Sequence, residues 1–278
     1  MSALISCLTN SYGRFGAQAG IEQMAAAGIH HVELPIRTAG VDSPFGDQPF
    51  VTTAATLDDL KDADQLLQRH GVSASSCNVS SGNPLDPEVV AITQRKLDLA
   101  KHFGVSLVVG GAGEASSPEE LETLHGNLRE IGDHAGRLGI TYCFETHPGI
   151  CQHHRGMLDT MQALDHPHLK LNFDTANILY YNENVVSETA LAKVCHHVRH
   201  IHLKDSQGDF GKWYFPALGR GGAVDFVRVL QLMTTCGFTG PYSLEIEGIA
   251  GEGDLPLEAY QQRIVESVEH LRTCGYFD

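Results

Sequence analysis

The sequence predicts a (β/α)8 barrel, and three observations lead to that fold class. The chain has 278 residues, which is an ordinary length for a single barrel of this kind. Short apolar segments alternate with longer amphipathic ones along its whole length, as in chains that build a parallel sheet. Four of the short segments also carry a possible metal ligand near their C-terminal ends, the end at which parallel barrels place their active sites.

The short apolar segments are expected to be the eight strands of the barrel. They cover residues 4–8, 31–35, 72–79, 105–110, 140–145, 169–174, 198–203 and 242–247. Helices are expected between them, and three have clear N-terminal capping residues in Thr56, Asp86 and Ser117. Those three helices should run toward Gly71, Gly104 and Gly139 respectively.

Several of the expected helices end in the same way, with a glycine followed by an apolar residue. The glycines are Gly28, Gly71, Gly104, Gly139 and Gly237. This pattern is typical of a helix that turns directly into a buried strand. An open doubly wound sheet is the alternative, but no glycine-rich phosphate-binding motif follows the first strand. We therefore expect one barrel domain over residues 1–278.

Composition excludes several classes of partner. The net charge of −15 disfavours binding to nucleic acid and to anionic membranes. No apolar stretch approaches 18 residues, and the N-terminus lacks the basic segment of a signal peptide. The seven cysteines are odd in number and form no CxxC pair. We expect reduced thiols and a cytoplasmic protein.

The four possible ligands are Glu145, Asp174, His202 and Glu245, at 29, 28 and 43 positions from one another. No single loop or helix can gather residues so far apart, whereas strand ends around a barrel can. Three carboxylates and one imidazole favour one divalent cation, Mn²⁺, Mg²⁺, Co²⁺ or Zn²⁺, over a thiolate-bound metal.

Side-chain alternation along the strands supports this interpretation. If the four ligands face the barrel axis, large apolar residues such as Phe144, Phe173 and Ile201 face outward. Any one strand-end carboxylate usually caps a helix or pairs with a basic residue. Four unpaired polar groups inside one barrel would be costly without a cation, so the set is interpreted as functional.

The chain resembles the sugar-phosphate isomerase/epimerase family of xylose isomerase-like TIM barrels. That family includes D-tagatose 3-epimerases, inosose dehydratases, hydroxypyruvate isomerases and, more distantly, endonuclease IV. The matching segments are Cys-Phe-Glu145-Thr-His147, Asn-Phe-Asp174-Thr-Ala-Asn177, His200-Ile-His202-Leu-Lys204-Asp205, Leu218-Gly-Arg220-Gly-Gly-Ala-Val-Asp225-Phe226 and Ser243-Leu-Glu245-Ile-Glu.

The resemblance implies that Glu145, Asp174, His202 and Glu245 bind one divalent cation and that the two glutamates also move protons. Many members have a histidine three residues after the metal-binding aspartate, where this chain has Asn177. Endonuclease IV uses such extra histidines for additional zinc ions. Asn177 and the acidic net charge therefore disfavour a repair nuclease and favour a site with one metal ion.

The chemistry that fits these residues is proton abstraction next to a carbonyl, with an enediolate intermediate stabilised by the cation. We expect an isomerase or epimerase that acts on a keto-sugar or related polyol. His147, Asn177 and Lys204 are expected to bind substrate. Glu33 and Arg220 are further candidates, although Glu33 could form a structural ion pair and Arg220 could cap its loop.

Two other functions stay open at this stage. The same site could eliminate water or a larger group from a keto-cyclitol or keto-glycoside, as an inosose dehydratase-like lyase does. A non-catalytic sugar-binding barrel would not need both glutamates. Few basic residues lie near the last strands, so a neutral sugar or cyclitol is favoured over a sugar phosphate. The expected partner is this small molecule, and the chain is compatible with a homodimer or homotetramer.

Overall fold

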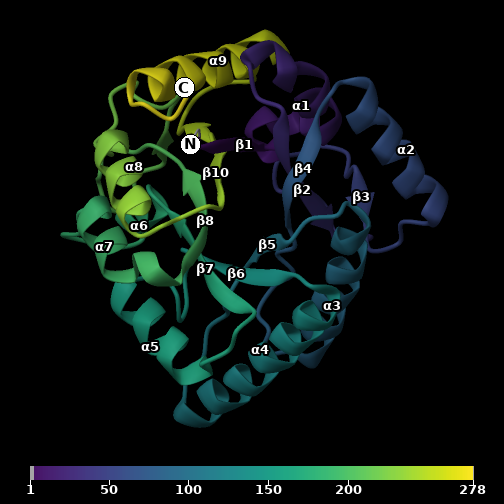
Figure 1. Cartoon of the computed structure of the whole chain (residues 1–278), viewed down its shortest axis with the longest axis vertical. Coiled ribbons are helices and arrows are strands. Elements are labelled where there is room, and N and C mark those ends of the chain that lie inside the picture. Colours follow the sequence, from purple (N-terminus) through teal and green to yellow (C-terminus); the bar gives the residue numbers. More distant parts are fainter. Residues whose placement is uncertain (1–2, 278) are drawn as a thin grey trace.

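The computed structural model describes residues 3–277, and its centre is a closed barrel of eight parallel strands (Figure 1). Strand β1 pairs with β2 on one side and with β10 on the other, which closes the ring. This confirms the predicted (β/α)8 barrel. The barrel strands are β1 (Leu4–Leu8), β2 (His31–Arg37), β4 (Ser73–Asn78), β5 (Leu107–Gly110), β6 (Thr141–Glu145), β7 (Leu169–Asp174), β8 (Val198–Leu203) and β10 (Pro241–Leu244).

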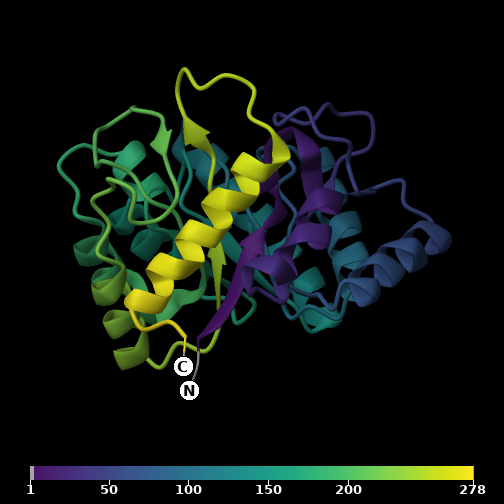
Figure 2. The same cartoon turned by 90° about the horizontal axis from the view of Figure 1, so that it is seen from above.

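Helices surround the barrel and follow its strands in order (Figures 1 and 2). The last helix lies beside the first strand, so the two ends of the fold meet. The α-helices are α1 (Gly16–Met24), α2 (Leu57–Arg69), α3 (Pro87–His102), α4 (Pro118–Leu138), α5 (His154–Leu164), α6 (Asn177–Tyr180), α7 (Ser187–Val194), α8 (Phe226–Thr235) and α9 (Leu257–Thr273). Three 3-10 segments join them, η1 (Thr9–Phe15), η2 (Ala25–Ala27) and η3 (Cys195–His197).

The capping signals in the sequence act as expected. Thr56 forms a capping box with Asp59 at the start of α2, and the Asp86 and Ser117 side chains accept backbone N–H bonds at the starts of α3 and α4. Helix α4 ends at Gly139, whose φ of 70° is left-handed and therefore suits glycine.

Three short strands lie outside the barrel and were not expected. Strand β3 (Val51–Thr52) extends the sheet beside β2, and β9 (Tyr214–Phe215) pairs antiparallel with β11 (Gly248–Ile249). The last barrel strand also ends earlier than expected, at Leu244. Beyond it, the Ile246 N–H donates to the Ser11 hydroxyl instead of continuing the ladder, and the chain enters β11.

The two faces of the strands differ as the alternation predicted. Tyr142, Phe144, Phe173 and Ile201 are buried in the hydrophobic core between strands and helices. Polar side chains fill the barrel interior and are fully buried there: Ser6, Glu33, Ser76, Asn172, His200 and Ser243. The interior of the barrel is therefore unusually polar.

The expectation of reduced cysteines throughout the chain is wrong for two of them. Cys195 and Cys236 form a disulfide that joins the segment before β8 to the end of α8. They are 41 positions apart, so no local motif indicates the pairing. The other five are free thiols. Within residues 3–277, no helix is long and apolar enough to cross a membrane.

Candidate active site

The four ligand candidates converge at the C-terminal end of the barrel. Glu145 and Asp174 are the last residues of β6 and β7, His202 is next to last in β8, and Glu245 directly follows β10. One ligand atom from each lies within 4.8 Å of the others. All four side chains are buried. The strand order places β8 between β7 and β10, which puts His202 in the middle of the group.

His202 has carboxylates on both sides of its imidazole ring. Its Nδ1 lies 3.0 Å from Glu245 Oε2, 3.3 Å from Glu145 Oε1 and 3.9 Å from Asp174 Oδ2. Its Nε2 lies 3.0 and 3.2 Å from the two oxygens of Glu33. Burial lowers the pKa of His202, but the negative charges of Glu33 and Glu245 outweigh burial and raise that pKa well above its ordinary value.

Two carboxylate oxygens in this group lack a hydrogen-bond partner among the described residues, Asp174 Oδ2 and Glu245 Oε2. The other Asp174 oxygen is well bonded, since it accepts the N–H groups of Ala176 at 2.8 Å and Asn177 at 2.7 Å. Burial, to which the Glu245 charge adds, raises the pKa of Asp174 to about 7 although Lys204 opposes the rise. These buried oxygens have ion-pair contacts with His202 but no hydrogen bond, which is costly, and a cation among them would remove that cost.

Glu33 lies beneath the site, fully buried, and does not line the cavity above it. Its contacts with His202 and His200 correspond to the structural ion pair considered for it rather than to a contact with substrate. Burial raises its pKa, but the positive charges of His202 and His200 prevail and lower it to about 2. An ionised Glu33 that accepts from Nε2 leaves Nδ1 of His202 free for a metal ion, which is a common arrangement behind metal-bound histidines.

A second buried histidine completes this lower layer. His200 Nε2 lies 2.9 Å from the Ser76 hydroxyl, and its Nδ1 lies 2.9 Å from Asn172 Oδ1. Burial lowers the pKa of His200 to about 4, in spite of the neighbouring Glu33 charge. His200 therefore supports the site from inside the barrel.

Lys204 and Asn177 form part of the wall above the ligands. The buried Lys204 Nζ lies 2.5 Å from Glu247 Oε2, 3.7 Å from Glu245 Oε2 and 3.1 Å from Asn177 Oδ1. Burial lowers the Lys204 pKa, but Glu245 and Glu247 outweigh burial and raise it above the ordinary value. Lys204 is thus a fixed positive charge beside the candidate metal ligands.

A cavity of about 380 Å³ opens above these residues. Its lining includes five polar residues, Glu145, Glu245, Glu247, Lys204 and Asn177. It also includes Pro44, Phe45, Tyr181, Trp213 and Phe215, most of which are aromatic. Sugars have both hydroxyl groups and apolar C–H faces, so this combination suits them. The aromatic lining was not predicted, although Trp213 is the only tryptophan of the chain.

His147 and Arg220, both expected near substrate, lie in different places. His147 lines the cavity, and its Nε2 is 3.2 Å from the Tyr181 hydroxyl. The Arg220 side chain is 61% exposed and pairs with Glu266 of α9 at 2.9 Å, away from the cavity lining. Its contribution is to hold its loop against α9, which corresponds to the structural alternative considered for it.

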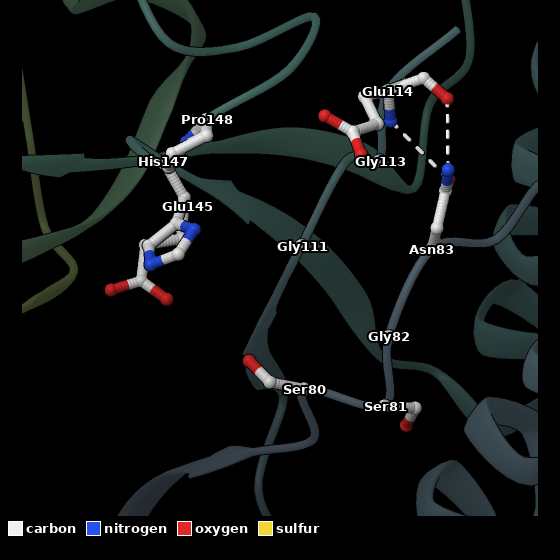
Figure 3. A pocket seen from close by; sticks show the side chains of 10 residues that line it. All are labelled: Ser80, Ser81, Gly82, Asn83, Gly111, Gly113, Glu114, Glu145, His147 and Pro148. Atoms are coloured by element: carbon white, nitrogen blue, oxygen red, sulfur yellow. Dashed lines mark hydrogen bonds between the residues drawn. The ribbon is translucent and has the colours of Figure 1, made fainter. Parts of the chain in front are cut away.

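A second cavity of about 350 Å³ adjoins the first, since Glu145 and His147 line both (Figure 3). It extends toward the loops that follow β4 and β5. In Figure 3, Glu145 and His147 lie on one side of it, Asn83 and Glu114 lie on the other, and Gly111 lies between. No motif in the sequence indicates this extension.

No curated protein matches the chain significantly. A xylose isomerase domain protein from Planctomyces limnophilus has a TM-score of 0.73 at 20% identity, with 98% of this chain and 96% of that chain covered. A xylose isomerase-like TIM barrel protein from Mycobacterium smegmatis in complex with magnesium has a TM-score of 0.72 at 18% identity, with 99% and 98% covered.

Two further solved structures are of proteins named for a reaction. D-psicose 3-epimerase with D-tagatose, from Clostridium cellulolyticum H10, has a TM-score of 0.73 at 15% identity, with 100% of this chain and 99% of that chain covered. A probable 3-DHS dehydratase from Bacillus anthracis has a TM-score of 0.72 at 15% identity, with 96% and 98% covered. At these identities the likeness concerns the fold alone. The family described as xylose isomerase-like TIM barrel matches residues 21–274, and the chain therefore belongs to that family.

Proposed function

We propose that this protein is a divalent-metal-dependent isomerase or epimerase that acts on a keto-sugar or a related polyol. The observation that carries the proposal is the convergence of four buried ligand atoms within 4.8 Å, two of them oxygens without a hydrogen-bond partner among residues 3–277. Solved structures with the same fold include 3-epimerases of ketoses and a magnesium complex, which supports this choice.

Glu145, Asp174, His202 and Glu245 fit a divalent cation by their chemistry. Three carboxylates and one imidazole suit Mn²⁺, Mg²⁺, Co²⁺ or Zn²⁺. The bond between Glu33 and His202 Nε2 orients the ring so that Nδ1 points at the three carboxylates. When bound, such a cation supplies electrophilic stabilisation of negative charge on a carbonyl oxygen.

Glu145 and Glu245 are proposed to move the proton. They come from β6 and β10, which are separated in the sheet by β7 and β8, so they reach the cavity from different sides. One carboxylate takes the proton from the carbon next to the carbonyl. The other returns a proton to the opposite face of that carbon, which gives an epimer, or to the adjacent carbon, which gives an isomer.

The remaining cavity residues position the sugar. Lys204 and Asn177 are linked by a hydrogen bond and present a cation and an amide to its hydroxyl groups. Trp213, which is 39% exposed, offers an apolar surface for a C–H face of the sugar. Among the residues that line the two cavities, Lys204 is the sole Lys or Arg, and Glu247 already neutralises it. A neutral substrate therefore fits better than a phosphorylated one.

A dehydratase or lyase acting on a keto-cyclitol or keto-glycoside is the second candidate. The observation in its favour is the position of His147, which lines both cavities next to Glu145. A histidine there could protonate an oxygen that leaves from the carbon beyond the enediolate. The structural likeness to a probable 3-DHS dehydratase agrees with such a reaction on this fold.

Solvent deuterium exchange tests the proposal. The protein is treated with EDTA, divided, and one part is reloaded with Mn²⁺ or Mg²⁺. Each part is incubated in D₂O with D-fructose, D-tagatose, L-ribulose and an inosose, and proton NMR follows the C–H next to the carbonyl. We expect exchange only in the metal-loaded protein. Metal binding without exchange in these sugars and in larger sugars that contain a ketose unit would contradict the proposal.

A further inference from the structure

The cavity beside the candidate active site is bounded by a preformed wall. The Asn83 side chain joins the loops after β4 and β5, because it donates to the Glu114 carbonyl at 2.9 Å and accepts the Glu114 N–H at 3.2 Å (Figure 3). The Ile150 N–H donates to the Gly113 carbonyl at 3.0 Å, which ties the loop after β6 to the same place. The cavity therefore does not depend on a ligand to bring its loops together.

The groups that face this cavity suit hydroxyl groups. The Ser80 hydroxyl and the Glu114 carboxylate have no hydrogen-bond or ion-pair partner within the part of the chain described here. In Figure 3 the Glu114 carboxylate points toward the side on which Glu145 and His147 lie. No Lys or Arg is among the lining residues, and so an anionic group would find no counter-charge.

Gly111 lies between the two sides of this cavity. A Cβ built on it would meet no atom within 4 Å, and its φ is not in the left-handed range. The backbone thus permits a side chain at this position, and the space that one would fill is open. Because Gly111 lines the second cavity, a large side chain at this position would take up space that a ligand in that cavity needs.

The size of the combined space exceeds that of one monosaccharide. A hexose takes up on the order of 200 Å³, about six or seven times the share of liquid volume that one water molecule occupies. The cavity at the candidate metal ligands, at about 380 Å³, already holds such a sugar. The adjoining 350 Å³ is then free for a second unit of similar size.

We propose that the substrate is a ketose that carries a second neutral, hydroxyl-bearing unit, such as a ketose-containing disaccharide. The keto-sugar lies beside Glu145 and Glu245, and the second unit lies in the cavity bounded by Ser80, Gly111 and Glu114. The bond between the two units passes His147, which lines both cavities. This inference rests on the proposed function and narrows its substrate class.

Binding measurements on sugar probes test the inference. The probes are D-fructose and four of its glycosides with different linkages: turanose, lactulose, leucrose and isomaltulose. Fluorescence of Trp213, the only tryptophan, reports occupancy of the first cavity in metal-loaded protein without any turnover. We expect at least one disaccharide to bind ~10-fold or more tightly than fructose, which corresponds to one or two well-made hydrogen bonds.

Three variants test whether the second sugar unit binds in the cavity beside Gly111. Gly111→Leu should weaken disaccharide binding ~10-fold or more and change fructose binding less than ~2-fold. Gly126→Leu is the matched control, because Gly126 is exposed in α4 and also has open space at its Cβ. It should change neither affinity. Glu114→Ala, at an exposed position that folding does not need, should weaken disaccharide binding ~5-fold.

The outcomes separate this inference from the proposed function. Equal or tighter binding of fructose, no binding of any disaccharide, or equal effects of Gly111→Leu on both kinds of sugar would overturn the inference. Metal-dependent deuterium exchange is measured in parallel. Exchange into fructose without a disaccharide preference overturns the inference alone, whereas a disaccharide preference without exchange into any probe overturns the proposed function.

Discussion

His202 has carboxylates at both nitrogens of its ring, and this determines how it can act. Glu33 approaches Nε2 from inside the barrel, while Glu145 and Glu245 approach Nδ1 from the cavity side. In the absence of a cation these charges favour a protonated ring. A cation among the three carboxylates would be held by a neutral His202 through Nδ1, with Nε2–H donating to Glu33.

A substitution of Glu33 should therefore act through His202 on metal affinity. We expect Glu33→Gln to weaken Mn²⁺ binding by about 10- to 100-fold, because the amide is a poorer acceptor for Nε2–H and leaves the ring less basic. Calorimetric titration of the EDTA-treated protein with Mn²⁺ measures this. Ser76→Ala, which removes a hydrogen bond from His200 and leaves His202 untouched, is the control. Equal affinities of Glu33→Gln and the parent protein would show that Glu33 does not position His202.

The two glutamates should affect turnover far more than folding. We expect Glu145→Gln and Glu245→Gln each to lower the rate of deuterium exchange by at least ~10²-fold, which is the usual contribution of a positioned acid or base. Asp174→Asn should act mainly by weakening metal binding. Rates are compared at saturating Mn²⁺ with bound metal quantified in each variant. Near-normal exchange in both glutamine variants would favour a binding role for the site.

Single residues were predictable where strand alternation determined their direction. Glu145, Asp174, His202 and Glu245 lie at or next to the C-terminal end of a strand whose other polar residues share the inner face, so their convergence followed from the barrel itself. Glu33 was open to two interpretations because its partner His202 lies on β8, across the barrel from β2. Arg220 was open to two interpretations because its partner Glu266 is distant in sequence.

Among the secondary structure elements, the β9–β11 pair supplies aromatic residues to the cavity, which the barrel strands do not. The Ala250 N–H donates to the Trp213 carbonyl at 2.9 Å, which extends the two-stranded pairing and holds Trp213 in place. Trp213 then packs edge-on against Tyr180 and Phe215. Strands of two residues inside long loops have no periodic pattern, which explains why the sequence did not reveal them.

Trp213 should contribute to substrate affinity more than to the rate of the chemical step. A sugar face of roughly 50 Å² buried at about 25 cal/mol per Å² contributes about 1 kcal/mol, or a factor of about five in affinity. We therefore expect Trp213→Ala to raise KM about fivefold and to leave kcat within about twofold. Phe210→Ala is the control, since Phe210 is 58% exposed and outside the cavity lining. A loss confined to kcat would contradict this role.

At the scale of the whole molecule, the polar interior makes stability depend on pH. His200 is buried and its pKa is lowered from 6.5 to about 4, mainly by burial, while Glu33 and His202 are the charged groups that face it. The unfolded chain therefore binds a proton at this histidine below about pH 6.5, whereas the folded protein does so only near pH 4. Stability from this group is complete above pH 6.5 and is lost as pH falls toward 4.

The size of this loss can be measured by comparing two proteins. Between pH 7 and pH 5 the shift corresponds to about 2 kcal/mol of unfolding free energy. We expect His200→Gln to lose about 2 kcal/mol less than the parent over that interval in urea unfolding experiments. EDTA is present throughout, so that metal release does not contribute. Parallel pH profiles for the two proteins would show that His200 is not the responsible group.

The global fold was the most predictable level, because length, alternation and glycine helix ends agree on one topology. The Cys195–Cys236 disulfide was not predictable, since its two residues meet only when η3 and the end of α8 are packed together. The choice between reactions is also a property of the whole site. It depends on how a substrate lies relative to Glu145, Glu245 and His147 in two joined cavities.

The last prediction concerns that choice. An isomerase or epimerase leaves the substrate mass unchanged in H₂O and adds one deuterium in D₂O, whereas a lyase releases water or a larger group and leaves an unsaturated product that absorbs in the near ultraviolet. We expect unchanged mass, because Glu145 and Glu245 can serve as a proton-moving pair. Elimination would need an acid for the leaving oxygen, and His147 is the candidate for that role where the two cavities meet. Mass spectrometry after incubation with keto-sugars, keto-inositols and 3-keto-glycosides measures this, and His147→Gln provides the comparison. Loss of mass from any of them, abolished in His147→Gln and with none isomerised, would establish elimination as the reaction.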